Sequence, residues 1–99
     1  MIVVLGYMKL DSAAIDDDLK AAMQTVMTTT RGETGCHRYS LALEDEAAGT
    51  VSISELWADA DALKAHGAQP HMAAFGAALK GKVRAMDLKM YDADNERAL

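Results

Sequence analysis

Apolar residues recur along this 99-residue chain with two different periods, and the period changes where the secondary structure is expected to change. Alternation and a wealth of β-branched residues predict four strands, over residues 2–9, 36–45, 50–57 and 82–91. Helical spacing between the first two strands predicts one helix, with its apolar stripe at Ile15, Leu19, Ala22, Met23, Val26 and Thr30. A second helical region covers residues 60–66, breaks at Gly67–Pro70 and continues from Pro70 until Gly81.

The predicted order of elements is β-α-β-β-α-β, which is the order of the ferredoxin-like α+β fold, a four-stranded antiparallel sheet with helices on one face. The first strand is apolar on both sides, because Leu5 and Tyr7 alternate with Val4 and Met8. No further element remains to cover the second face of the sheet, so we expect a homodimer in which a second copy packs sheet to sheet. Residues 1–92 are expected to form the one domain, and residues 93–99 a polar C-terminal tail.

The composition restricts the classes of partner that the protein is expected to bind. The formal net charge is −5 at pH 7, which disfavours nucleic acid and anionic membranes as partners. A single cysteine, Cys36, excludes an intramolecular disulfide and suits a reducing cytoplasm. No apolar run reaches the roughly 20 residues of a membrane helix, and Met1–Lys9 lacks the basic start of a signal peptide. We therefore expect a cytoplasmic protein.

Chemically versatile side chains gather between Trp57 and Phe75, a stretch that holds the only Trp, the only Pro, the only Phe and two of the three His residues. Nowhere in the chain does a Gly-rich phosphate loop follow a strand, and no pair of cysteines offers a cluster site. We therefore expect no cofactor. A zinc site formed by His66, His71 and Glu55 matches no established ligand spacing, so we expect no metal.

Three local patterns together resemble the antibiotic biosynthesis monooxygenase (ABM) family of dimeric α+β barrels. They are the Glu33-Thr34-Gly35-Cys36 turn with Arg38-Tyr39, the strand end Glu55-Leu56-Trp57, and Ala62-Leu63 with His66, Pro70-His71 and Phe75. Gln69 departs from the Ser that is common before the Pro-His pair. The resemblance covers nearly the whole domain, although relatives differ widely in substrate.

The resemblance implies oxygenation of a hydroxylated aromatic or quinol by molecular oxygen, without metal or flavin. Such a reaction needs a base that forms the substrate anion in a dry pocket. The haem-degrading branch of the superfamily has an Asn on its first strand, whereas Asn95 in the tail is the only Asn here, which disfavours haem. Two alternatives remain: an isomerase of the same fold that shuttles a proton by His66 or His71, and a non-catalytic dimeric ligand-binding or stress-associated protein.

The two histidines of the central stretch are the main catalytic candidates. His71 follows Pro70 in a first helical turn, where the helix dipole disfavours the charged form, so it is the expected base. His66 ends the preceding helix, where the dipole favours imidazolium, so it is expected to hold the substrate anion. The link between them turns the chain, which would let both face one pocket. Each also has a structural reading, as a hydrogen-bonding residue at a helix end.

Tyr39 is the third catalytic candidate, because its hydroxyl can bind an oxyanion, although it can equally well serve sheet packing. The expected substrate-binding residues are Trp57 and Phe75 as pocket walls, Glu55 on the same strand face as Trp57, and His37 on the Tyr39 side of its strand. Glu55 has three expected partners, since it can orient a histidine or pair with Arg38 or Arg84.

Overall fold

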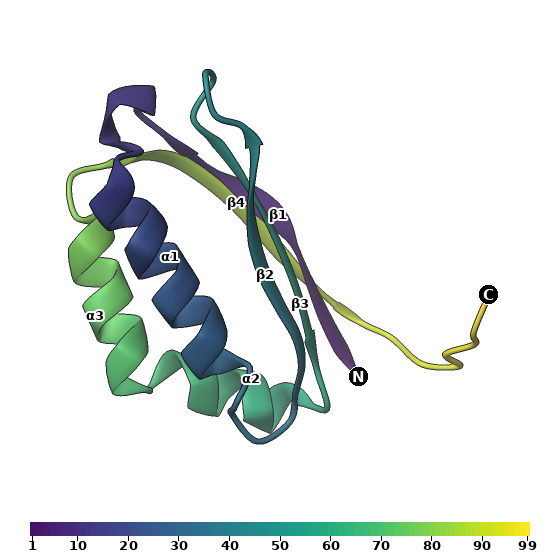
Figure 1. Cartoon of the computed structure of the whole chain (residues 1–99). Coiled ribbons are helices and arrows are strands. Elements are labelled where there is room, and N and C mark those ends of the chain that lie inside the picture. Colours follow the sequence, from purple (N-terminus) through teal and green to yellow (C-terminus); the bar gives the residue numbers. More distant parts are fainter.

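The computed structural model describes all 99 residues, and its elements follow the predicted order (Figure 1). The strands are β1 (Ile2–Leu10), β2 (Cys36–Asp45), β3 (Thr50–Trp57) and β4 (Val83–Asp92). The helices are a short 3-10 turn (Ser12–Ala14), α1 (Asp17–Thr30), α2 (Ala60–Gly67) and α3 (Pro70–Leu79). All strand pairs are antiparallel and the sheet order is β2-β3-β1-β4, which confirms the ferredoxin-like α+β fold.

Helix α1 does not begin directly after the first polar residues that follow β1, but further along the chain. Asp16 caps it, because its side chain accepts a hydrogen bond of 2.8 Å from the backbone N–H of Leu19. Asp17 and Asp18 then lie in the first turn, where the helix dipole favours negative charge. Asp11 is also a cap, but of the separate 3-10 turn at Ser12–Ala14, so the chain turns once before the helix starts.

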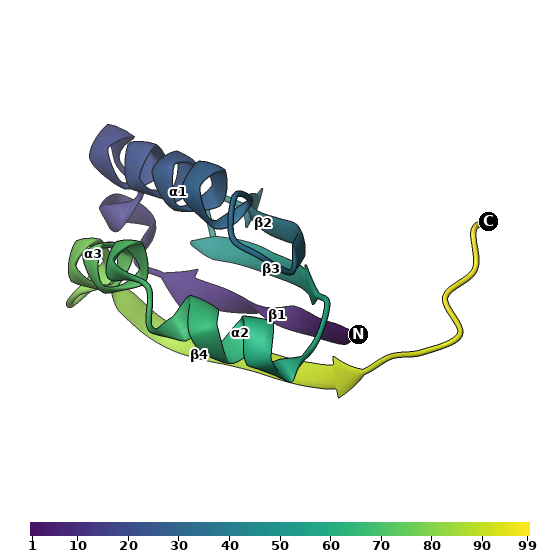
Figure 2. The same cartoon turned by 90° about the horizontal axis from the view of Figure 1, so that it is seen from below.

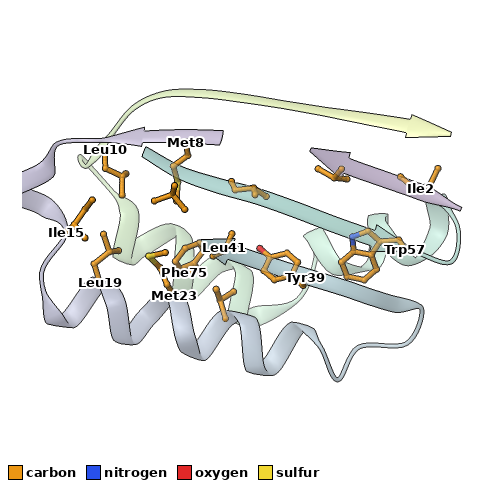
Figure 3. Close-up of a cluster of buried hydrophobic side chains, with 14 residues drawn as sticks. Ile2, Met8, Leu10, Ile15, Leu19, Met23, Tyr39, Leu41, Trp57 and Phe75 are labelled. Atoms are coloured by element: carbon orange, nitrogen blue, oxygen red, sulfur yellow. The ribbon is translucent and has the colours of Figure 1, made fainter. Parts of the chain in front are cut away.

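The hydrophobic core lies between the helices and one face of the sheet (Figures 2 and 3). Val4 and Met8 point from β1 into it, and the buried stripe of α1, which includes Leu19 and Val26, belongs to the same cluster. Trp57 is fully buried at the end of β3. Burying a large apolar side chain stabilises a fold by about 1.5–3 kcal/mol, so this one layer supplies most of the stability available to a single chain. None of the helices has the length and apolar character needed to cross a membrane.

The opposite face of the sheet has no helix on it (Figure 1). Leu5 and Tyr7 of β1 lie there with 49% and 40% of their surface exposed, and Tyr91 of β4, which pairs with Val3, is 50% exposed. This is the face on which the sequence predicts a second copy.

Strand β4 is an edge strand whose helix-side residues are also open. Met86, Leu88 and Met90 pair with the helix-facing residues of β1, yet they remain 52%, 39% and 55% exposed. The helices leave this edge of the sheet uncovered, and the cavity described in the next subsection opens there.

Candidate active site

A cavity of about 440 Å³ lies between the sheet and helices α2 and α3. Twelve of its sixteen lining residues are hydrophobic, so polar chemistry in it depends on very few groups. Three of these are Tyr39 from β2, Glu55 from β3 and His66 from α2. Lys89 of β4 also borders the cavity, but it pairs with Leu5, whose side chain lies on the opposite face of the sheet, and its ammonium group forms an ion pair of 2.6 Å with Asp87.

His66 is buried at one end of this cavity and is held on three sides. Its Nδ1 lies 2.8 Å from Oε2 of Glu33, and its ring packs against those of Tyr39 and Trp57 at centroid distances of 5.1 and 4.8 Å. Its Nε2 makes no hydrogen bond, and no buried side-chain nitrogen or oxygen in the structure lacks a partner. Nε2 is therefore not fully buried, and His66 is one of the residues that line the cavity.

Tyr39 and Glu55 supply the other two polar groups of the cavity. Burial raises the pKa of the Tyr39 hydroxyl, and the nearby carboxylates of Glu55 and Glu33 raise it further, so this hydroxyl stays protonated and can donate a hydrogen bond. Burial also raises the pKa of Glu55, while the hydrogen bond from Trp57 opposes that shift.

Glu55 has a different partner from those expected. The indole Nε1–H of Trp57 donates to its Oε1 at 2.9 Å. Arg38 instead donates from Nε to Oγ of Ser54, and Arg84 pairs with Asp11. The alternation of β3 explains the outcome, because Glu55 and Trp57 both point into the core, whereas the two arginines lie on exposed strand positions.

His71 lies in the first turn of α3 as predicted, but it does not line the cavity. Its Nε2 is 2.9 Å from the same Glu33 Oε2 that His66 contacts, and 3.3 Å from Oγ1 of Thr30. It borders a separate polar hollow together with Glu33. The expectation that both histidines face one pocket is therefore corrected, because the end of α1 holds His71 on the other side of Glu33.

Glu33 is the residue of this site that our sequence reasoning missed. It lies in the turn between α1 and β2, and its side chain is only 11% exposed. Gly35 brings that turn against α2: its φ is +81°, its carbonyl accepts from the Ala58 N–H at 2.8 Å, and a Cβ there would lie 2.7 Å from Cβ of Ala62. The Glu33-Thr34-Gly35-Cys36 motif was the available signal, but a glutamate in a turn reads as solvent-exposed.

The remaining predicted residues fall in three different places. Phe75 is buried and lines the cavity. Trp57 does not line it, but forms the wall behind His66. His37 is exposed and borders a small surface hollow with Arg31 and Arg38, because the strand register shifts between Cys36 and Arg38. The structure thus brings Tyr39, His66, Glu55 and Phe75 together and leaves His37 and His71 outside.

The cluster of Glu33, His66 and His71 also has the composition of a metal site. Its ligand atoms all lie within 4.8 Å of one another, and two histidines with one carboxylate form a known zinc-binding set. The two hydrogen bonds to Glu33 Oε2 already pair these three groups with one another. The three side chains have the right chemistry to bind a metal ion. Their hydrogen bonds to one another also satisfy them when no ion is bound.

Comparison with known proteins agrees with the fold. The family model described as "Antibiotic biosynthesis monooxygenase" matches residues 1–78. A Caulobacter crescentus CB15 structure, provisionally named an antibiotic biosynthesis monooxygenase, has a TM-score of 0.85 at 27% identity and covers 95% of this chain and 90% of its own. A Deinococcus radiodurans structure with the same provisional name has a TM-score of 0.85 at 23% identity, covering 100% and 98%. Rv0793 from Mycobacterium tuberculosis reaches 0.82 at 23% identity, covering 98% of each chain. No curated protein matches the sequence.

Proposed function

Because this chain belongs to the antibiotic biosynthesis monooxygenase family, we propose that it oxygenates a hydroxylated aromatic or quinol with molecular oxygen and without a cofactor. The single observation that carries the proposal is that Nε2 of His66 has no hydrogen-bond partner at the end of a mainly apolar cavity. A neutral imidazole in that position can accept a proton from a bound hydroxyl group. The proposed base is therefore His66 and not His71.

The proposed reaction starts with transfer of the substrate O–H proton to Nε2 of His66. The resulting anion gives one electron to O₂, and the two radicals combine through a new C–O bond into a peroxide, which takes the proton back from His66. The same carbon then loses its remaining hydrogen as a proton while the O–O bond breaks. The products are a carbonyl group and water, so one oxygen atom of O₂ enters the substrate.

The cavity suits each requirement of this reaction. Its walls, which include Leu41, Ile53 and Phe75, are apolar, so they bind water weakly next to the reacting groups. The Tyr39 hydroxyl is a donor for the developing oxyanion. The lining offers no unpaired lysine or arginine side chain, because Lys89 lies on the sheet face of Leu5 and is paired with Asp87, which favours a substrate that is neutral before the base acts.

The test is oxygen uptake by purified protein with a panel of anthrones, naphthols and quinols. We expect His66→Gln to lower the turnover number by roughly 10²-fold or more, as loss of a general base does. His37→Gln is the matched control, because His37 is exposed and lies outside the cavity, and it should retain full activity.

Full turnover by His66→Gln would remove that residue from the mechanism. Proton exchange or isomerisation of a panel compound without oxygen uptake would instead support an isomerase of the same fold that uses the same histidine.

A further inference from the structure

We propose that Glu33 is the positioning residue of this site, which keeps a proton on Nδ1 of His66 so that the lone pair of Nε2 points into the cavity. This inference rests on the proposed function, since it explains how His66 would be prepared to act as a base. His71 takes part indirectly, by holding the Glu33 carboxylate in place.

The contact with Glu33 fixes the tautomer of the His66 imidazole. A carboxylate only accepts hydrogen bonds, so the Nδ1 of His66, which lies 2.8 Å from Oε2 of Glu33, must be the donor. A neutral imidazole carries one N–H, and placing it at Nδ1 leaves Nε2 as an acceptor. Without Glu33 the imidazole would be free to carry its proton on Nε2, where it could not take one from a substrate.

Glu33 also lies next to the positive charge that would develop on His66 during the reaction. Once His66 accepts a proton, an imidazolium stands inside a mainly apolar site, which is costly unless an opposite charge is in contact with it. Glu33 is in contact at 2.8 Å, and its own side chain is only 11% exposed, so the pair is weakly screened by solvent. Glu55 is less suited to this role, because burial raises its pKa and the Trp57 indole occupies its Oε1.

Glu33 is itself held in place by a second histidine. Nε2 of His71 lies 2.9 Å from the oxygen that His66 uses, so two rings from different helices hold one carboxylate between them. Thr30, the last residue of α1, is 3.3 Å from the same His71 nitrogen. The turn that carries Glu33 is thus tied to α3 as well as to α2, which limits the carboxylate to the position where it meets Nδ1.

The experiment follows the tautomer of His66 directly, in the whole protein labelled with ¹⁵N. Long-range ¹H–¹⁵N correlation at neutral pH identifies which ring nitrogen carries the proton. We expect Nδ1–H for His66 in the wild type and a shift toward Nε2–H in Glu33→Ala and Glu33→Gln, the second of which preserves the volume of the side chain. Glu44→Gln, at an exposed position of β2, is the matched control and should leave the tautomer unchanged.

A second readout uses 4-nitrophenol, whose absorbance separates its phenol and phenolate forms. We expect the wild type to bind it as phenolate, and Glu33→Gln to lower the ionised fraction by roughly tenfold or more, which is the size of one hydrogen bond to a charged group. His71→Gln retains an N–H donor and should have a smaller effect than His71→Ala.

The outcomes separate the two proposals. A wild type that does not ionise the probe, but shows Nδ1–H on His66 and loses it in Glu33→Gln, would sustain the role of Glu33 and count against His66 as a phenol base. A wild-type His66 with its proton on Nε2, or an unchanged tautomer in both Glu33 variants, would overturn the inference. Stoichiometric metal in the native protein with no proton on Nδ1 would overturn it too, because the cluster would then be a metal site.

Discussion

At the scale of single residues, burial decides which polar groups of the cavity carry charge. Desolvation and two neighbouring carboxylates raise the pKa of Tyr39, so it remains neutral, and in the proposed reaction it is a donor and not a base. In the same proposal His66 accepts the proton through Nε2, the ring nitrogen that has no hydrogen-bond partner. One group therefore donates and the other accepts, as anion formation requires.

Tyr39→Phe tests the donor. The variant keeps the aromatic ring that packs 5.1 Å from His66 and removes only the hydroxyl, so folding should be preserved. We expect turnover to fall by about 10²-fold, as observed when one oxyanion donor is lost, with little change in the melting temperature. Oxygen uptake and thermal unfolding measured on the same sample provide the check. Unchanged turnover would assign Tyr39 to packing alone.

Glu55→Gln tests the buried carboxyl through the pH dependence of stability. The folded state raises the pKa of Glu55 above its ordinary value of 4.5, so it favours the protonated form. The stabilisation linked to this group is complete below the ordinary pKa and is lost as the pH rises through the raised one. Glutamine keeps the acceptor for Trp57 but does not titrate.

We therefore expect the free energy of unfolding of Glu55→Gln to increase relative to that of the wild type as the pH rises. Urea unfolding of both proteins from about pH 4 to pH 8 measures this difference. A difference between the two proteins that does not change with pH would show that Glu55 has no raised pKa.

The sequence predicted part of the site because strand alternation reports the direction of a side chain. Tyr39 and Glu55 lie on the buried faces of their strands, and Phe75 on the apolar stripe of its helix, as expected. The partner of His66 could not be predicted, because Glu33 reaches it from a turn 33 residues away in the chain. Helix periodicity likewise placed His71 in the right turn of α3 but carried no information about what that turn packs against.

At the scale of elements, the turn between α1 and β2 is the part on which the site depends. Gly35 allows it to approach α2 closely, because the residue adopts a φ of +81° that L side chains rarely take. The lengths of the strands were predictable from alternation and turn residues: β2 and β3 have the bounds that the sequence indicates. The contact of this turn with α2 was not predictable, since it depends on how two remote segments pack.

Gly35→Ala is the corresponding prediction. Its new Cβ would lie 2.7 Å from Cβ of Ala62, and the positive φ adds strain, so we expect a loss of roughly 1–3 kcal/mol in the free energy of unfolding. The turn should also withdraw Glu33 from His66, which would change the His66 tautomer. Gly32→Ala is the control, because its Cβ would meet only the Thr29 carbonyl at 3.5 Å and no positive φ is involved. Equal stability of the two variants would contradict this account of the turn.

At the scale of the whole molecule, the absence of phosphate-binding and cluster motifs predicts a protein that acts without a cofactor. We expect the purified protein to be colourless and to contain metal only in substoichiometric amounts. Visible absorbance and elemental analysis by mass spectrometry check this, with His71→Ala as a control for adventitious metal at the His66–Glu33–His71 cluster. A flavin or haem band at full occupancy would contradict the proposed reaction, and one metal ion per chain that His71→Ala abolishes would assign the cluster to metal.

The exposed sheet face leads to the last prediction. ABM family proteins typically form dimeric barrels, and here Leu5, Tyr7 and Tyr91 leave an apolar surface open on the side away from the helices. We expect a homodimer with a mass near twice the 10.6 kDa of the chain. Leu5→Asp should separate it, because a twofold interface would bring two buried carboxylates into one apolar layer.

Leu99→Asp is the matched control, since it makes the same exchange on the exposed C-terminal tail and should leave the dimer intact. Light scattering coupled to size exclusion at micromolar concentration gives the masses, and a monodisperse wild-type monomer would refute the barrel. Because Glu33, which contacts Nδ1 of His66, belongs to the same chain as that histidine, a folded Leu5→Asp monomer should keep the Nδ1–H tautomer of His66. Loss of that tautomer in a folded monomer would show that the partner subunit supports the site, which the contacts within a single chain do not require.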